Sequence, residues 1–123
     1  MTGDGSGVPD DCLFCKIVAG EIPSTSVLDR ENVYAFRDVA PAAPVHVLVV
    51  PKQHISDVRQ LEASHGSVLV EMFDAANEVA RAESVAESGY RLLFNVGPDA
   101  GQTIFHLHMH VVGGKPLGMV API

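Results

Sequence analysis

Three histidines, His106, His108 and His110, occupy every second position between residues 105 and 112. Successive side chains of an extended strand point to opposite faces, so this spacing predicts three imidazoles in a row on one face. The alternate positions are apolar and predict a buried face made of Phe105, Leu107, Met109 and Val111. Imidazoles titrate near neutral pH and act as nucleophiles, bases and ligands. The row therefore indicates a functional site and not a purely structural strand.

Three kinds of chemistry fit such a row: metal binding, nucleophilic or acid–base catalysis, and anion binding. A single metal ion held by all three is the weakest of these, because same-face neighbours on a strand lie about 6.5–7 Å apart. An imidazole nitrogen attacks phosphorus readily, and a neighbouring carbonyl or histidine can hold its ring in the required tautomer.

The segment before the histidines, residues 95–103, has the composition of a phosphate-binding loop. Gly97 and Gly101 would let the backbone approach a ligand closely, and Asn95, Gln102 and Thr103 add short polar side chains. Glycine-containing loops mostly mark turns. The interpretation as a phosphate-binding loop is supported here because the segment leads directly into the histidines.

The chain also contains the pair Cys12 and Cys15, which forms half of a zinc-site pattern. Two other interpretations stay open: free thiols in a reducing compartment, or a redox pair.

The elements that must position these residues indicate an α+β fold. The apolar pattern predicts a short helix over 12–19 capped by Asp11, and a long helix over 63–85 capped by Ser64 or Ser67. The expected strands form a largely antiparallel sheet of about five members and cover residues 26–29, 33–37, 45–50, 90–96 and 103–112.

Composition favours a single domain over 12–123 after a Gly- and Asp-rich tail at 1–11, which we expect to be disordered. The net charge of −7 argues against nucleic-acid binding but not against one nucleotide in a pocket. No apolar run is long enough to cross a bilayer, and no signal peptide is recognisable. We therefore expect a cytoplasmic protein with no membrane partner.

The stretch 106–112 matches the His-φ-His-φ-His-φ-φ signature of the histidine triad (HIT) family at every position, where φ is apolar. Segments 14–17, 21–23, 35–38, 51–55 and 101–105 also resemble this family, in family order across about residues 12–114. The sequence Val112-Gly113-Gly114-Lys115 is similar to the Hint-like branch of nucleoside phosphoramidases.

This resemblance implies hydrolysis of purine nucleoside 5′-phosphoramidates through a nucleotidyl-histidine intermediate. His108 would be the nucleophile, His110 would bind the phosphate, and His46 would stand beside the site. Thr103 would act on the phosphate or leaving group together with Asn95, Gly101 and Gln102. Asp38 would accept the ribose hydroxyls, and an apolar slot for the base would consist of Leu13, Phe14, Ile17, Phe36 and Val39, which core packing explains equally well.

The resemblance further implies a structural Zn²⁺ bound by Cys12, Cys15, His54 and His106, although His106 has a competing role as an active-site support. It also implies a homodimer with one continuous sheet, which fits the apolar residues Val70 and Phe73 on the long helix. Two alternative functions remain: hydrolysis of dinucleoside polyphosphates or adenylyl compounds, and nucleotide binding by a regulatory protein.

Overall fold

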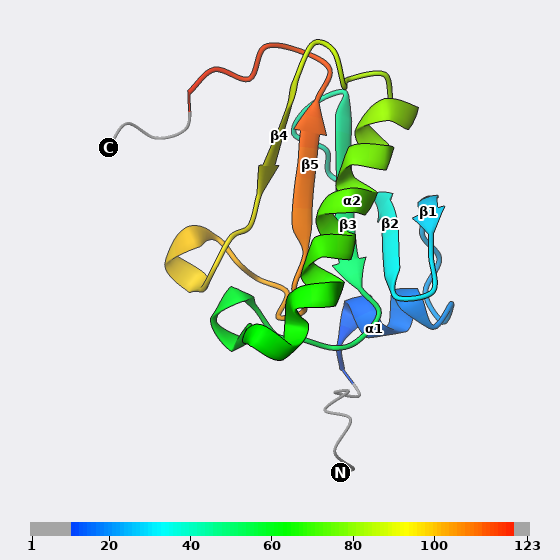
Figure 1. Cartoon of the computed structure of the whole chain (residues 1–123), viewed down its shortest axis with the longest axis vertical. Helices are drawn as coiled ribbons and strands as arrows, with labels where there is room; N and C mark the ends of the chain where they lie inside the picture. The colour runs from blue at the N-terminus through cyan, green and yellow to red at the C-terminus, as the bar shows by residue number, and fades with distance from the viewer. Residues whose placement is uncertain (1–10, 120–123) are drawn as a thin grey trace.

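The computed structural model describes residues 11–119, in which one antiparallel sheet carries two helices. The strands are β1 (Ser26–Asp29), β2 (Val33–Arg37), β3 (Val45–Pro51), β4 (Tyr90–Leu93) and β5 (Met109–Gly113), arranged in the order β1-β2-β3-β5-β4. The long helix α2 (Gly66–Ala82) crosses one face of the sheet (Figure 1). The short helix α1 (Leu13–Val18) packs on the opposite face. The predicted α+β fold with a five-stranded antiparallel sheet is confirmed.

The main core lies between α2 and the sheet. The helix contributes small and flexible buried side chains, including Met72, Ala75, Ala76 and Val79, which allow it to lie close to the strands. The central strand β3 is buried at all seven positions, because its odd-numbered residues face α2 while Leu48 and Val50 face α1. β3 is thus a fully covered strand; it carries His46 and pairs with β5, which carries His110.

A second, smaller core forms beneath α1. Phe14 meets Phe36 edge to face with ring centroids 5.4 Å apart, and Leu48 and Val50 complete the cluster. The residues predicted to hold a nucleotide base therefore also anchor α1 to the sheet.

The histidine-bearing strand is shorter than predicted. It was expected over 103–112, but β5 begins at Met109, and residues 103–108 make no ladder with β3 or β4. Before Met109 the chain diverges from β3, and the backbone N–H of Leu107 donates instead to the carbonyl of Ile55. Phe105, predicted to be buried, is consequently 43% exposed. The alternation itself persists, since Leu107, Met109 and Val111 all face the α2 core.

Several predicted boundaries and caps are also corrected. The strand expected over 90–96 ends at Leu93, and a 3₁₀ turn at 63–65 precedes α2. Neither predicted serine caps this turn; Glu62 and His65 form a reciprocal capping box there. At α1 the cap is Cys12, whose Sγ accepts from the Cys15 N–H, and not Asp11.

Residues 1–10 and 120–123 lie outside the described part of the chain. The N-terminal tail predicted to be disordered, residues 1–11, therefore falls outside the described residues except for Asp11. Within 11–119, no helix combines the length and apolar character that crossing a bilayer requires.

Candidate active site

The three triad histidines divide into two groups. His108 and His110 lie side by side with ring centroids 5.2 Å apart, and His46 on β3 lies 5.1 Å beyond His110. His106 is fully buried and turns toward Cys12 and Cys15 instead. The local cause is the bend before β5, which separates His106 from the regular part of the strand.

His108 and His110 border a pocket of about 390 Å³ that we call the nucleotide pocket. Its walls include most side chains that the sequence assigned to nucleotide binding: Leu13, Phe14, Ile17, Phe36, Asp38, Val39, Asn95, Gly101 and Thr103. The sequence assignments missed other lining residues, namely Ile22, Pro23, Arg37, Leu48 and Ile104. All but Leu48 lie in segments that carried the family resemblance, and Leu48 could be found only from its pairing with His110.

Hydrogen bonding fixes the tautomer of His108. Its Nδ1 lies 2.7 Å from the backbone carbonyl of His106, and because a carbonyl only accepts, Nδ1 carries the proton. The lone pair therefore resides on Nε2. Burial lowers the pKa of His108 below its usual value, partly opposed by the bond to the His106 carbonyl. His108 is thus a neutral imidazole with a free nitrogen beside the pocket.

A second chain of hydrogen bonds fixes the tautomer of His110. The Ala42 N–H donates to Nδ1 of His46 at 3.0 Å, which places the His46 proton on Nε2. That nitrogen lies 2.8 Å from Nδ1 of His110, so His110 accepts there and carries its own proton on Nε2. Within residues 11–119, His110 Nε2 is buried without a hydrogen-bond partner. A buried donor left unpaired is costly, and an anion in the pocket would satisfy it.

Burial lowers the pKa of His110 to about 4, and the neighbouring His108 and His46 contribute to the shift. The side chain is therefore neutral at physiological pH. Asp38 lies on the same side, with Oδ2 3.5 Å from His46 Nε2 and Oδ1 accepting from the Ala40 N–H. The site thus offers one unpaired neutral donor, His110 Nε2, to an anion, and one carboxylate, Asp38, near His46.

The loop before the histidines is held from within by Gln102. Gly97 and Gly101 adopt positive φ angles of 82° and 87° on either side of a 3₁₀ turn. Gln102 is 5% exposed; its Oε1 accepts from the Gly97 N–H at 2.8 Å, and its amide donates to the carbonyls of Ser56 and Ile104. Both amide hydrogens are therefore in use, and Gln102 does not line the nucleotide pocket as the other assigned residues do.

The remaining site residues form a cluster that we call the Cys/His cluster: Cys12, Cys15, His54 and His106. One donor atom from each lies within 4.8 Å of all the others. Bond lengths of about 2.05 Å for Zn–N and 2.3 Å for Zn–S give tetrahedral edges of about 3.3 Å between two nitrogens and about 3.6 Å between nitrogen and sulfur. The observed separations are 3.3 Å for His54 Nδ1 to His106 Nδ1, 3.4 Å for Cys12 Sγ to His106 Nδ1, and 3.4 Å and 3.5 Å for Cys15 Sγ to Nδ1 of His54 and of His106.

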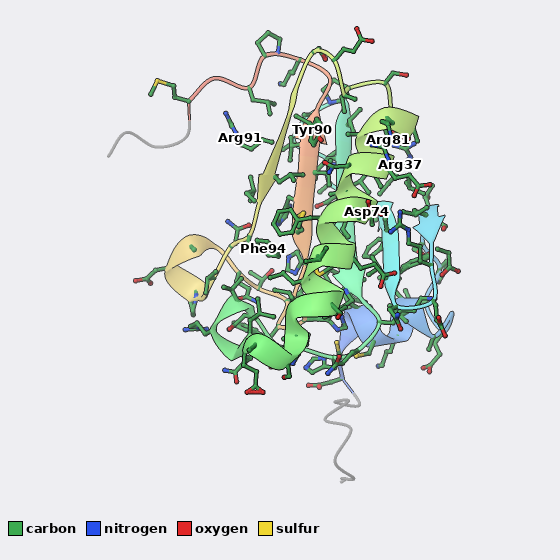
Figure 2. All side chains as sticks on the ribbon, in the orientation of Figure 1. Arg37, Asp74, Arg81, Tyr90, Arg91 and Phe94 are labelled. Carbon is green, nitrogen blue, oxygen red and sulfur yellow. The ribbon has the colours of Figure 1, made fainter. Side chains whose placement is uncertain are left out.

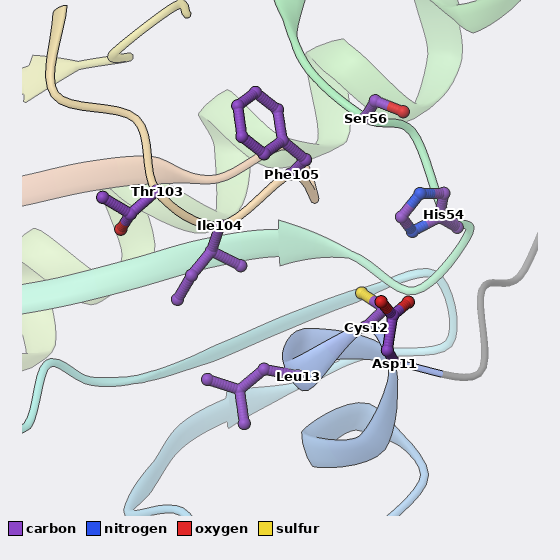
Figure 3. A pocket seen from close by; sticks show the side chains of 8 residues that line it. All are labelled: Asp11, Cys12, Leu13, His54, Ser56, Thr103, Ile104 and Phe105. Atoms are coloured by element: carbon purple, nitrogen blue, oxygen red, sulfur yellow. The ribbon is translucent and has the colours of Figure 1, made fainter. Parts of the chain in front are cut away.

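The protonation states in the cluster fit the same use. Nε2 of His106 donates to the Pro51 carbonyl at 2.8 Å, which leaves the lone pair of Nδ1 directed at the cysteines. Burial lowers the pKa of His106 to about 4, so the ring is neutral. Burial and the proximity of Cys12 raise the pKa of Cys15 to about 12, so this thiol stays protonated unless a bound cation stabilises its thiolate. Figure 3 shows Cys12 and His54 at the edge of a separate pocket of about 340 Å³.

Known proteins are similar to this chain in sequence and in fold. The HIT domain family model matches residues 19–117. A purine nucleoside phosphoramidase from Escherichia coli (strain K12) is 42% identical over 109 residues, covering 89% of this chain and 92% of that protein. An adenylylsulfatase from Arabidopsis thaliana is 38% identical, covering 85% of this chain and 72% of that protein. A solved HIT family hydrolase from Clostridium thermocellum superposes with a TM-score of 0.89 at 47% identity, covering 92% of this chain and 98% of that one. The chain belongs to the HIT family.

Proposed function

We propose that this chain hydrolyses purine nucleoside 5′-phosphoramidates at the P–N bond and releases a nucleoside monophosphate. Membership of the HIT family and similarity to hydrolases within it support an enzyme that acts on nucleotides. The observation that carries the finer proposal is the tautomer of His108, because its free Nε2 borders a pocket of nucleotide size beside the unpaired N–H of His110.

In this proposal the base lies in the apolar part of the pocket, between α1 and Phe36. The ribose hydroxyls donate to Asp38, since a carboxylate accepts from two neighbouring hydroxyls. The α-phosphate lies against His110 Nε2 and the loop that carries Asn95, Gly101 and Thr103. Gln102 takes a positioning role, because its amide holds that loop closed.

The reaction then proceeds in two displacements. His108 Nε2 attacks phosphorus, the P–N bond to the leaving group breaks, and the amine departs with a proton from solvent. Thr103 stands at the pocket wall, where its hydroxyl can bond the leaving group. The His106 carbonyl stabilises the positive charge that develops on the His108 ring. Water then attacks phosphorus, the bond to His108 breaks, and the nucleoside monophosphate leaves.

We further propose that Cys12, Cys15, His54 and His106 hold a structural zinc ion. Four protein ligands leave no open coordination position, so such an ion contributes folding stability and not catalysis. These residues join the start of α1 to the segment that ends at His108. The cluster thereby helps to place the His106 carbonyl against the nucleophile.

We also propose that the chain forms a homodimer and is located in the cytoplasm. A homodimer with a continuous sheet would cover Val70 and Phe73, which are 69% and 41% exposed on α2. Sedimentation at micromolar concentration distinguishes the dimer from a monomer. The cytoplasmic location and the absence of nucleic-acid and membrane partners are likewise proposed, on charge and composition alone.

A His108→Ala variant tests the activity most simply. We expect its turnover of adenosine 5′-phosphoramidate to fall by orders of magnitude while the circular-dichroism spectrum is unchanged. His65→Ala is the matched control, because His65 lies in the capping box before α2 and, among the described residues, its side chain makes no hydrogen bond to the nucleotide pocket. Wild-type turnover in the His108 variant would show that another group attacks phosphorus.

A further inference from the structure

The segment that follows β3 runs beside the loop 95–103 and contacts it from outside the sheet. The carbonyl of Ser56 accepts from the Gln102 amide at 3.3 Å, and the 3₁₀ turn Val58–Gln60 lies next to the loop (Figure 1). On the sheet side the loop begins after Phe94, which packs against the α2 core; Figure 2 shows Phe94 where the chain leaves β4. Beyond Phe94 the loop therefore depends on contacts that the sheet does not supply.

The most extensive of these contacts is made by Arg59, whose guanidinium covers Gly97. A Cβ added to Gly97 would lie 3.4 Å from Nη1 of Arg59 and 3.6 Å from both Cζ and Nη2. Because these three distances are nearly equal, the flat face of the guanidinium, and not its edge, lies over the glycine. A lysine ammonium has no such face, so the contact is specific to arginine.

The carboxylate of Asp57 fixes the orientation of this guanidinium. Its Oδ2 accepts from Nη2 of Arg59 at 2.7 Å and from Nε at 3.2 Å, while Oδ1 accepts from the Arg59 backbone N–H at 2.8 Å. Asp57 is 4% exposed, and its bonds to Arg59 lower its pKa below the usual value, against the effect of burial. A buried carboxylate that accepts three hydrogen bonds from one arginine holds that side chain in a single orientation.

The residue beneath the guanidinium is the point where the hydrogen bonds of the loop converge. The carbonyl of Gly97 accepts from the N–H groups of Ala100 at 3.2 Å and of Gln102 at 3.1 Å. The N–H of Gly97 donates to Gln102 Oε1. A displacement of Gly97 would therefore move Gly101 and Thr103, which line the nucleotide pocket.

We propose that Arg59 is a positioning residue for the reaction at His108. Held by Asp57, its guanidinium packs on Gly97 and keeps the loop in the conformation that reaches the nucleotide pocket. Arg59 does not line that pocket, so it acts through the loop and not on the substrate. The inference rests on the proposed nucleotidyl transfer to His108, because it assigns the loop to the reacting phosphate.

The variant Arg59→Lys tests the flat contact, because it keeps the charge and loses the planar face. We expect kcat for adenosine 5′-phosphoramidate to fall about tenfold, since misplacement by about 1 Å can cost about a hundredfold and the loop keeps its Gln102 contacts. KM should change less than twofold, because the proposed base and ribose subsites lie against α1, Phe36 and Asp38 and not against the loop.

Arg30→Lys is the matched control, because Arg30 pairs with Asp74 and Glu78 and does not line the nucleotide pocket. Both of its kinetic constants should equal those of the wild type. Wild-type kcat in Arg59→Lys would overturn the proposal. A raised KM with unchanged kcat would overturn it as well, since that result indicates direct contact between Arg59 and the substrate.

The variant Asp57→Asn tests how the guanidinium is held. An amide oxygen can still accept from the Arg59 backbone N–H, but the amide NH₂ cannot accept from the guanidinium. We expect kcat to fall several-fold, and the double variant Asp57→Asn/Arg59→Lys to lose no more than Arg59→Lys alone. Losses that multiply in the double variant would show that Asp57 does not act through Arg59.

Amide hydrogen exchange tests the contact without any substrate. In Arg59→Lys we expect the N–H groups of Gly97, Ala100 and Gln102 to exchange several-fold faster than in the wild type, while those of β3 are unchanged. Unchanged exchange in the loop, or an equal increase in the loop and in β3, would refute the proposal. If the wild-type chain hydrolyses no phosphoramidate while exchange rises in the loop alone, the proposed function is refuted, and Arg59 still holds the loop.

Discussion

Replacing Gln102 by alanine should destabilise the protein and weaken catalysis together. The substitution removes three hydrogen bonds from a side chain that is 5% exposed: one at 2.8 Å to Gly97, one at 3.1 Å to Ile104 and a longer one at 3.3 Å to Ser56. A protein hydrogen bond contributes a net of about 0.5–1.5 kcal/mol, so the loss should be about 2–4 kcal/mol. Because the loop also carries Gly101 and Thr103 into the nucleotide pocket, kcat/KM should fall as well.

Urea unfolding and steady-state kinetics on the same preparations measure the two effects. Gln60→Ala provides the control, since Gln60 is exposed and its side chain makes no hydrogen bond with the described residues. If Gln102 instead bonded the substrate directly, Gln102→Ala would raise KM with an unchanged free energy of unfolding. That result would refute its positioning role.

Three further predictions concern the Cys/His cluster, His110 and Gly114. If the Cys/His cluster binds zinc, the purified chain should contain about one zinc per molecule, and chelation should lower its melting temperature; metal-free protein with both thiols titratable contradicts this. Burial lowers the pKa of His110 to about 4 in the folded protein, whereas the same side chain in the unfolded chain has a pKa of 6.5. Because the unfolded chain binds the proton first, the free energy of unfolding should fall as the pH drops from 6.5 to about 4, by up to about 3 kcal/mol. His46, His108 and Asp38 also face this ring, so the free energy of unfolding is measured against pH for both wild type and His110→Asn. Parallel profiles for the two proteins would show that His110 does not cause the loss of stability. Gly114→Ala should cost about 1–3 kcal/mol in chemical denaturation, since φ is positive there and Pro44 blocks a Cβ; an unchanged midpoint would argue against the strained turn.

The alternation of apolar and histidine residues was enough to predict on which side of the sheet the residues from Leu107 to Val111 lie, whereas Phe105, predicted on the same apolar face, is exposed. Leu107, Met109 and Val111 pack against α2, and the histidines face away, as a period of two requires. The pattern could not show where hydrogen bonding stops. That boundary is set by the divergence of residues 103–108 from β3 and by the bond from Leu107 to Ile55, a contact between distant parts of the chain.

The different roles of the histidines were only partly predictable, because they also depend on contacts between distant parts of the chain. Family resemblance assigned His108, His110 and the cluster around His106, and the structure brings each group together. Each tautomer depends on the backbone group that the ring contacts. The His106 ring contacts the carbonyl of Pro51, which is distant in the sequence, and the His46 ring contacts the N–H of Ala42. The order of residues does not reveal either contact. Gln102 shows the limit most clearly: its residue type suits phosphate binding, but its burial turns the amide toward the loop.

The most direct test of the central claim is to identify the group that becomes nucleotidylated during turnover. Wild-type protein is mixed with adenosine 5′-phosphoramidate, quenched within one turnover, digested and analysed by mass spectrometry. We expect one adenylyl group on His108, whose Nε2 is the free nitrogen beside the nucleotide pocket. An adduct on His110, or hydrolysis with inversion at phosphorus and no adduct, would contradict nucleophilic attack by His108.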